Sequence, residues 1–532
     1  MKDGSRGWRK GAFLLTVAGP IRTELSAGDR IPLQNLTGDI GFFIYQQVYP
    51  LLGIGAVLSL YGFPSAVSYL TADAKRKGYP LSWRKFYFPV LLIIFFVIGV
   101  VAIILFALSE HLAIWIGDVH LTGAYKLTAI SLITIPFTSL LRGVSQGDLN
   151  MKPTAYSQLG EQLVRVTLII LMAVLVANLD FDHYTIGQGA AVASFSGALV
   201  TIIILLILLR REKQPSLTVT QEQSIPWGEY FRTILIFGFV ASLNHMVLLL
   251  FQFADSFTLF PALQEFGLQE KSAMEAKGVF DRGQPLIQLG TVLGSSFALA
   301  MIPTISRERF EQDPQEFYQR INSSIAIGFY LAVGATAGLI TIMPEANLLL
   351  FQDMKGTGDL RILVLSVLLT SVGITSATIL QGLGWVKRTA IFILLAVFVK
   401  WLGNILLVPV MGITGSALAT VIGLGVFMSL VMMELRRKLP GLAMAKQINW
   451  WTLTFAVFAM VLYIFIIDFF VPDTLSRSGA LVYVLVVSLT GAIIYIIVLL
   501  RGRAFISREI SILPFANLLM RIYKERKVDD KD

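Results

Sequence analysis

The sequence contains no cysteine, only four histidines and few charged residues, which make up 14% of its 532 positions. Without cysteine, the chain can form neither a disulfide nor a zinc–thiolate centre, and it has no thiolate nucleophile. Long apolar runs are abundant instead, because 55% of the residues are hydrophobic and the mean hydropathy is +0.72. This composition predicts a polytopic membrane protein and excludes an ordinary soluble domain.

Sequence motifs of several enzyme classes are also missing. The chain has no G-x-x-x-x-G-K-[ST] phosphate loop, so nothing in it predicts direct use of ATP, and it has no H-E-x-x-H zinc motif. Three histidines, His111, His120 and His183, fall in stretches that we expect outside the membrane, and His245 stands alone in an apolar span. We therefore expect a transporter without a metal or other cofactor, and not an enzyme.

Fourteen apolar segments are long enough to cross the bilayer core as helices, for which about twenty residues are needed. They cover residues 10–33, 39–72, 87–109, 123–146, 153–178, 186–209, 229–258, 284–306, 318–343, 360–384, 387–410, 412–435, 450–472 and 478–500. Pro50 and Pro64 should kink or break the second segment. The predicted fold class is thus an all-α polytopic membrane protein.

Basic residues gather in alternate connections between these segments. The clusters lie at 75–77, 84–85, 210–211, 436–438 and 501–527. Because cytoplasmic connections carry an excess of Lys and Arg, this pattern places both termini on the cytoplasmic side of a bacterial cell membrane. The same pattern accounts for the net charge of +9 through topology and anionic lipid, so we expect no nucleic-acid partner.

Part of the sequence is repeated. The stretch 146–155, QGDLNMKPTA, recurs in the second half of the chain as 381–390, QGLGWVKRTA. Six spans duplicated into six more, around a central cavity, are a common transporter plan. We predict an N-terminal six-helix lobe (1–209), a cytoplasmic linker (210–228), a C-terminal six-helix lobe (229–438), transmembrane helices 13 and 14 (439–502) and a cytoplasmic amphipathic tail (503–532).

Several ionisable residues fall where a membrane tolerates few of them. The first span carries Arg22, Glu24, Asp29 and Arg30, and such residues usually face a bundle interior or a water-filled cavity. If the segment is helical, Arg22 shares roughly one side with Asp29 and Arg30, which gives a polar route with a positive lining. Location at the membrane interface, or mutual pairing of these charges, is the alternative.

Two further cations follow from the repeat, and two polar residues suggest a cation site. When the two copies are aligned, Arg165 stands opposite Lys400, each inside a predicted span, and we assign both to substrate binding. For Arg165, pairing with Glu161 four residues earlier is an equally good structural explanation. Asn244 and Asp255 are eleven residues apart, close to three helical turns, and are candidates for binding a coupling cation.

Four motifs resemble one known family. They are R-I-P-L at 30–33, G-D-I-G at 38–41, E-Q-L-V-R-V at 161–166 and F-D-R-G-Q-P-L at 280–286. These motifs and their order along the chain are similar to those of the polysaccharide-exporter branch of the MOP superfamily. The nearest resemblance is to the stage V sporulation protein B group, which is related to the lipid II flippase MurJ. The resemblance extends from about residue 9 to residue 500.

The resemblance implies two pseudo-symmetric lobes that move an undecaprenyl-pyrophosphate-linked sugar or oligosaccharide across the cytoplasmic membrane by alternating access, with a glycan synthase as a possible partner. By family analogy, Arg22, Arg30 and Asp39 in the first lobe and Asp281 and Arg282 in the second contact the substrate. MurJ relatives have further arginine in the second span, whereas residues 41–70 here contain none. This difference leaves open a lipid-linked glycan other than lipid II as the substrate.

The energy source and two other functional classes stay open at this level. Membrane potential, or a sodium or proton gradient, could drive transport. A cation-coupled multidrug antiporter belongs to the same superfamily, although its cavity should be acidic and not cationic. A membrane-embedded glycan polymerase or acyltransferase would need catalytic residues in external loops, where His111, His120 and His183 are the weak candidates.

Overall fold

The computed structural model describes residues 28–79, 81–179, 181–211, 225–240, 242–301, 313–442, 447–472 and 475–505, together with 510, 519–521 and 523. These residues form helices joined by short turns, without any strand among them. Twelve of the described helical segments are long and apolar enough to span a membrane. The prediction of an all-α polytopic membrane protein is thus confirmed, while the count of fourteen spans stays a prediction.

The chain forms two compact units, which we describe separately. The first unit comprises Met1–Asp281 and Asn404–Gly412, and the second comprises Arg282–Gly403 and Ile413–Asp532. The predicted lobes, linker and tail, with their boundaries, stay predictions.

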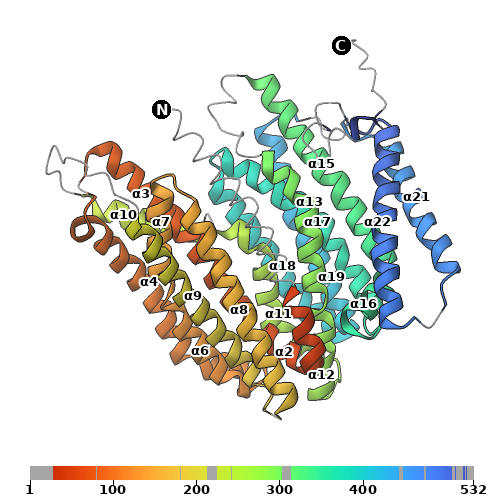
Figure 1. The fold of residues 1–532 in the computed structure, drawn as a ribbon, viewed down its shortest axis with the longest axis horizontal. Helices are drawn as coiled ribbons and strands as arrows, with labels where there is room; N and C mark the ends of the chain where they lie inside the picture. Colours follow the sequence, from red (N-terminus) through yellow and green to blue (C-terminus); the bar gives the residue numbers. More distant parts are fainter. Residues whose placement is uncertain are drawn as a thin grey trace. The chain divides into compact units, whose positions relative to one another are not determined.

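The first unit contains a bundle built from the N-terminal half of the chain. Its helices are α2 (Arg30–Val57), α3 (Phe63–Lys77), α4 (Phe88–Ala107), α5 (Ser109–Ile116), α6 (Thr122–Leu132), α7 (Ile135–Gly147), α8 (Lys152–Asn178), α9 (Thr185–Arg211), α10 (Trp227–Leu235), α11 (Val247–Glu265) and α12 (Glu270–Asp281). Helix α9 packs against α6, α7 and α8, and these four lie side by side (Figure 1). Helix α2 packs against α9, α11 and α12.

Helix α2 is interrupted near its start. Gly38 has φ of +68°, a left-handed conformation that divides the helical run and that glycine adopts without a steric penalty. This interruption lies between the first and second predicted spans, although most of the first span, including Arg22 and Glu24, lies outside the described residues. Residues 28–33 are therefore the described part of the first predicted span, and the second begins at Asp39.

The two prolines of the second span have different effects. Pro50 lies inside α2, where it cannot donate to the carbonyl of Gln46. That carbonyl accepts a hydrogen bond from Ser256 Oγ at 3.4 Å instead, so α2 continues. Pro64 lies in the first turn of α3, directly after a π-helical turn, Leu58–Gly62. The predicted break therefore occurs at the second proline.

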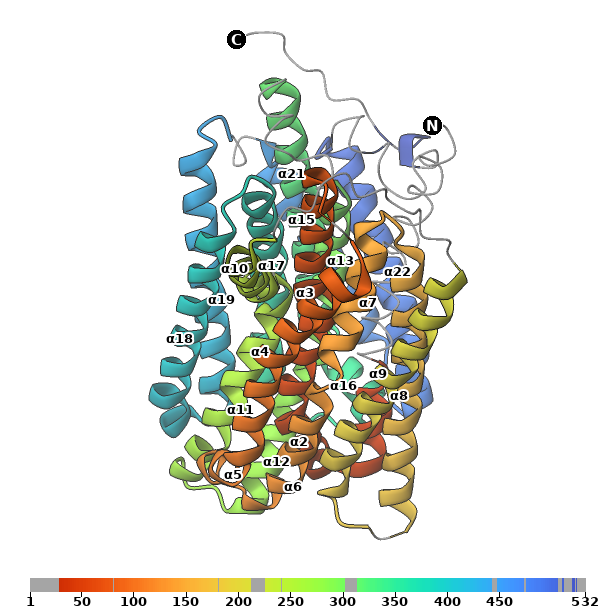
Figure 2. The same ribbon diagram turned by 90° about the vertical axis from the view of Figure 1, so that its left-hand side faces the viewer.

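The second unit contains the C-terminal helices. They are α13 (Gly283–Met301), α15 (Pro314–Thr341), α16 (Met343–Phe351), α17 (Thr357–Gly382), most of α18 (Val386–Met411), α19 (Ile413–Lys438), α21 (Trp450–Phe469) and α22 (Arg477–Arg501). Helices α13, α15 and α17 pack on one another, α17 packs on α19, and the pair α21–α22 packs on α15. Helices α18 and α19 run side by side (Figure 2).

The sequence repeat is visible in the structure. Helix α7 ends at Gly147, and α17 ends at Gly382, the matching glycine of the second copy. In both copies a glutamine amide at the helix end donates to a threonine hydroxyl at the start of the next helix. The distance from Nε2 to Oγ1 is 3.4 Å for Gln146–Thr154 and 3.2 Å for Gln381–Thr389. The repeated residues thus form the same helix–turn–helix connection in both copies.

The seventh predicted span, 229–258, is not one continuous helix. A π-helical turn, Ile236–Val240, and a 3-10 turn, Leu243–Met246, separate α10 from α11. Asn244 lies in the 3-10 turn and Asp255 in α11. The expected spacing of three α-helical turns between these two residues therefore does not hold.

Candidate functional site

Arg30 lies at the start of α2 and is buried, with 1% of its surface exposed. Its guanidinium carbon is 4.0 Å from the centre of the Tyr49 ring, so the cation stacks on the aromatic face. Within the part of the chain that the structure describes, its Nε and Nη1 atoms have no hydrogen-bond partner. Unsatisfied donors on a buried cation are costly, so this guanidinium is well suited to receive an anionic ligand. Tyr49 was not predicted as a site residue.

Two acidic residues lie near this arginine. Asp29 is buried directly before it, and its Oδ1 likewise has no hydrogen-bond partner in the described ranges. Asp39 follows the Gly38 interruption and accepts a hydrogen bond from Gln34 Nε2 at 3.0 Å. The backbone of Asp39 lies so close to Gly278 of α12 that a side chain at position 278 would collide with it. Helix α12 is thereby fixed directly against the start of α2.

Helix α12 contributes a buried ion pair. Lys277 Nζ lies 2.7 Å from Asp281 Oδ2, and both side chains are buried. The Lys277 ammonium also lies 5.5 Å from the centre of the Phe43 ring of α2. Lys277 was missed from the sequence because it lies in a stretch that we assigned to an external connection. Its spacing of four residues from Asp281 on a helix was the available signal.

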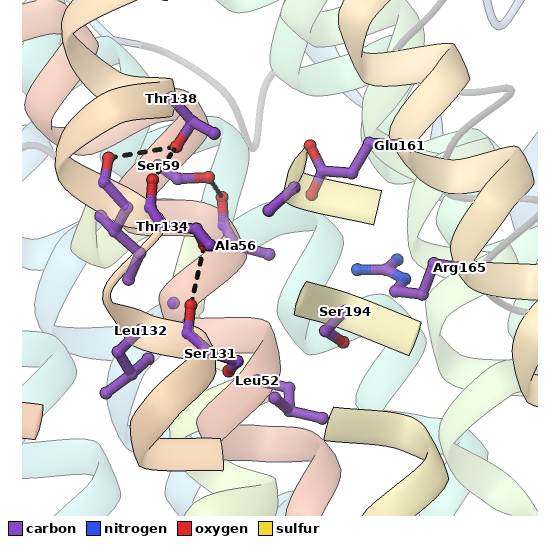
Figure 3. A pocket seen from close by; sticks show the side chains of 13 residues that line it. Leu52, Ala56, Ser59, Ser131, Leu132, Thr134, Thr138, Glu161, Arg165 and Ser194 are labelled. Atoms are coloured by element: carbon purple, nitrogen blue, oxygen red, sulfur yellow. Dashed lines mark hydrogen bonds between the residues drawn. The ribbon is translucent and has the colours of Figure 1, made fainter. Parts of the chain in front are cut away.

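Arg165 of α8 lines a polar pocket of the first unit (Figure 3). The other lining residues are Leu52, Gly55, Ala56, Ser59, Ser131, Leu132, Thr134, Ile135, Thr138, Glu161, Ser194 and Ala198. Arg165 donates to Gln162 Oε1. Glu161 pairs with Arg142, whose Nη2 lies 2.6 Å from Glu161 Oε2. Sequence analysis missed Arg142, which is also buried.

Lys400, the counterpart of Arg165 in the repeat, lies in a different environment in the second unit. Its side chain is fully buried, and its ammonium donates to the Ser416 carbonyl at 2.9 Å, to Ser416 Oγ at 2.8 Å and to Thr420 Oγ1 at 2.7 Å. Three hydrogen bonds equal the number of protons on the ammonium. This geometry links α18 to α19.

Arg282 is also engaged within the second unit. Its guanidinium is fully buried and forks onto Asp353, with Nη1–Oδ1 at 2.5 Å and Nη2–Oδ2 at 3.0 Å. Asp353 lies in the connection between α16 and α17 and was not predicted. Burial raises the pKa of this carboxyl, but hydrogen bonds from Arg282 and from the Lys355 backbone N–H outweigh burial and leave the pKa below its usual value.

The proposed cation-site residues are only partly brought together. Asp255 Oδ1 accepts a hydrogen bond from Asn404 Nδ2 at 2.8 Å, and the same nitrogen lies 2.7 Å from Thr258 Oγ1. All three side chains are buried in the first unit. The structure thus groups Asp255 with Asn404 from the end of α18, and it places Asn244 in the 3-10 turn before α11.

A large apolar pocket lies in the second unit between α13, α15 and the pair α21–α22. Its cavity volume is about 360 Å³. Glycines from three of these helices, Gly290, Gly334, Gly338 and Gly491, are among its lining residues, together with leucine, isoleucine and Tyr495. The small residues leave space where larger side chains would fill the interface between the helices.

Comparisons with known proteins agree with this architecture. The family described as polysaccharide biosynthesis protein matches residues 8–308. The membrane protein YabM of Bacillus subtilis is 36% identical over 81% of this chain and 80% of its own length. From the same organism, the lipid II flippase MurJ is 24% identical (78% and 80% covered) and stage V sporulation protein B is 23% identical (84% and 86% covered).

Solved structures show the same fold. The inward closed conformation of the lipid II flippase MurJ matches with a TM-score of 0.63 at 13% identity, covering 92% of this chain and 97% of that one. An inward-facing multidrug resistance MATE transporter of the MOP superfamily matches with a TM-score of 0.58 at 16% identity, covering 79% and 95%. The predicted resemblance is thus confirmed. The chain belongs to the polysaccharide biosynthesis protein family, and it has the fold of MurJ and of a MATE transporter of the MOP superfamily.

Proposed function

We propose that the protein moves an undecaprenyl-pyrophosphate-linked sugar or oligosaccharide from the inner to the outer leaflet of the bacterial cytoplasmic membrane by alternating access. The observation that carries this proposal is the buried Arg30 guanidinium, two donor nitrogens of which lack a partner among the described residues. A guanidinium binds phosphate oxygens through two parallel hydrogen bonds. Because its face stacks on Tyr49, its N–H edge is presented to such a ligand.

The apolar pocket of the second unit supports a lipid-linked substrate. Its walls are almost entirely hydrocarbon, and its volume of about 360 Å³ suits a length of polyprenyl chain better than a charged head group. A free sugar phosphate has no hydrocarbon chain that would contact these apolar walls. We therefore assign the pocket between α13, α15, α21 and α22 to a length of isoprenoid chain.

Membrane potential is the driving force that the substrate's charge favours. A pyrophosphate diester carries negative charge, and an inside-negative potential of 100 mV contributes ~2.3 kcal/mol for each elementary charge moved outward. A coupling cation is then an addition and not a requirement. If one binds, Asp255 Oδ1 and Thr258 Oγ1 are the proposed ligands, because both oxygens lie within hydrogen-bond distance of the same atom, Asn404 Nδ2.

The test is flipping of undecaprenyl pyrophosphate carrying a fluorescent sugar in proteoliposomes with an imposed inside-negative potential. We expect the change R30Q to reduce the flipping rate on the order of 10- to 100-fold, because it removes charge-assisted hydrogen bonds worth about 1.5–3 kcal/mol. R232Q is the matched control, because Arg232 is an exposed arginine of the same unit, and it should flip at the wild-type rate.

Two results would overturn the proposal. Wild-type protein that flips none of several lipid-linked sugars under an imposed potential would contradict the substrate. An R30Q variant that flips at the wild-type rate would contradict the role of Arg30. Export of a cationic drug by the same vesicles would favour the multidrug antiporter, the fold of which this chain shares.

A further inference from the structure

We infer that the polar pocket beside Arg165 binds a sugar hydroxyl of the transported head group, so that Arg165 recognises the glycan and not the pyrophosphate. This inference rests on the proposed function and refines it, since it assigns separate parts of the substrate to separate cations of the first unit. Arg30 receives the pyrophosphate, and Arg165 with the hydroxyl side chains of α6, α7 and the turn after α2 receives the sugar.

The pocket has the size of one small polar group. Its cavity volume is about 30 Å³, which is enough for about two water molecules. A pyranose ring is too large for this space, but a single hydroxyl or hydroxymethyl group fits. Figure 3 shows Arg165 and Glu161 on one side of the pocket, and Ser59, Ser131, Thr134 and Thr138 on the other side.

The hydroxyl side of the pocket presents hydrogen-bond acceptors. Each of its four hydroxyl groups donates its proton to a backbone carbonyl three or four residues earlier. The donor and acceptor residues are Ser59 and Ala56 at 3.0 Å, Ser131 and Thr128 at 2.7 Å, Thr134 and Ser131 at 2.8 Å, and Thr138 and Thr134 at 3.2 Å. A hydroxyl has only one proton to donate. Its oxygen can therefore offer only lone pairs to a molecule in the pocket.

The opposite side presents hydrogen-bond donors. The guanidinium of Arg165 carries five N–H groups, one of which is donated to Gln162. Glu161 beside it is charge-compensated, because its carboxylate pairs with Arg142 at 2.6 Å and accepts from Thr201 Oγ1 at 3.2 Å. The pocket therefore has a wall of hydroxyl acceptors facing a wall on which Arg165 offers donors beside the Glu161 carboxylate.

A group that both donates and accepts a hydrogen bond satisfies both walls. A phosphate oxygen would accept from Arg165, but it would face the lone pairs of the hydroxyl wall. A metal cation would suit the hydroxyl wall and be repelled by Arg165. An apolar group would leave both walls without hydrogen bonds. A sugar hydroxyl donates to one wall and accepts from the other, and its size matches the pocket.

The test compares two probes in the same proteoliposomes, undecaprenyl pyrophosphate that carries a hexose and undecaprenyl pyrophosphate alone. The variant T134V keeps the shape of the side chain and removes one acceptor of the pocket wall. We expect it to lower the ratio of hexose-linked to bare carrier flipping about tenfold, as does R165Q, because one buried hydrogen bond to a substrate hydroxyl is worth about 1.4 kcal/mol.

The control is T233V, because Thr233 Oγ1, outside the pocket, also donates to a backbone carbonyl of the preceding turn, that of Glu229, as Thr134 Oγ1 does to Ser131. It should keep the wild-type ratio. An unchanged ratio in T134V would overturn the inference and leave the pocket with water only. Equal loss of both probes in R165Q would assign Arg165 to the pyrophosphate instead. If wild-type protein flips neither probe, the proposed function itself fails.

Discussion

The two copies of the internal repeat differ at one point of the fourth and tenth spans. In the first unit, α6 ends at Leu132 and α7 begins at Ile135, whereas in the second unit α17 runs without interruption from Thr357 to Gly382. Pro136 lies in the first turn of α7, and Ser371 occupies the matching position of the second copy. Proline cannot donate to the carbonyl four residues earlier and collides with it. The proline at position 136 and the serine at position 371 therefore explain why the helix is broken in the first unit and continuous in the second.

The break has consequences for the buried cations of the two copies. In the first unit, the turn between α6 and α7 brings Thr134 to the wall of the pocket that Arg165 also lines. In the second unit, Lys400 donates three hydrogen bonds to α19. Duplicated cationic positions have thus acquired different environments, one beside a pocket and one inside a closed set of oxygens. Sequence symmetry alone does not assign both to the substrate.

The largest effect should come from transferring the break to the second unit. The change S371P places proline in the middle of the continuous helix α17, where it removes a backbone hydrogen bond and costs ~3 kcal/mol. The reverse change, P136S, should alter stability much less, since the turn at that position already lacks the regular bond. Melting temperatures in detergent would measure both. Equal loss in the two variants would contradict the role of proline as the cause of the break.

A smaller effect should follow from removing the Lys400 ammonium. The change K400M keeps the length of the side chain and abolishes its hydrogen bonds to Ser416 and Thr420, for an expected loss of about 1–3 kcal/mol in unfolding free energy. K387M is the control on the same helix, because Lys387 is exposed, and should melt like the wild type. A K400M variant of unchanged stability that no longer flips substrate would instead place Lys400 in the substrate site.

The sequence predicted most of the helices because hydrophobic length is the main determinant of a transmembrane segment. It did not predict the interruption of the seventh span at Ile236–Val240 and Leu243–Met246, although the first of these stretches is apolar and the second contains Asn244 and His245. Conversely, Pro50 was expected to disturb α2, but Ser256 of α11 satisfies the carbonyl that the proline leaves open. Tertiary contacts decide such cases, and a single sequence does not show them.

The candidate site was predictable in part for the same reason. Burial of Arg30, Arg165 and Lys400 followed from their positions inside apolar segments. Partners from distant parts of the chain were not predictable, such as Asp353 for Arg282 and Ser416 for Lys400, because no local spacing relates them. An arginine that is locked in a bidentate pair therefore cannot be told from one with unsatisfied donors until the fold is known.

The smallest predicted effect concerns the locked arginine of the second unit and its dependence on pH. Because hydrogen bonds from Arg282 and Lys355 leave the pKa of Asp353 below its usual value despite burial, the ion pair stabilises the fold fully above a pH of about 4, the ordinary carboxyl pKa. This contribution is lost as the pH falls through the lower pKa of the folded state. The change D353N removes the titrating group.

We therefore expect the melting temperature of the wild type in detergent to fall more steeply between pH 5 and pH 3 than that of D353N, with D353N less stable near neutral pH. The difference should be modest, because about a third of the Asp353 side chain is exposed and solvent screens the pair. Parallel curves for the two proteins would mean that Asp353 does not hold Arg282. Arg282 would then belong with Arg30 among the cations available to substrate, and the contrast between the two units would disappear at this position.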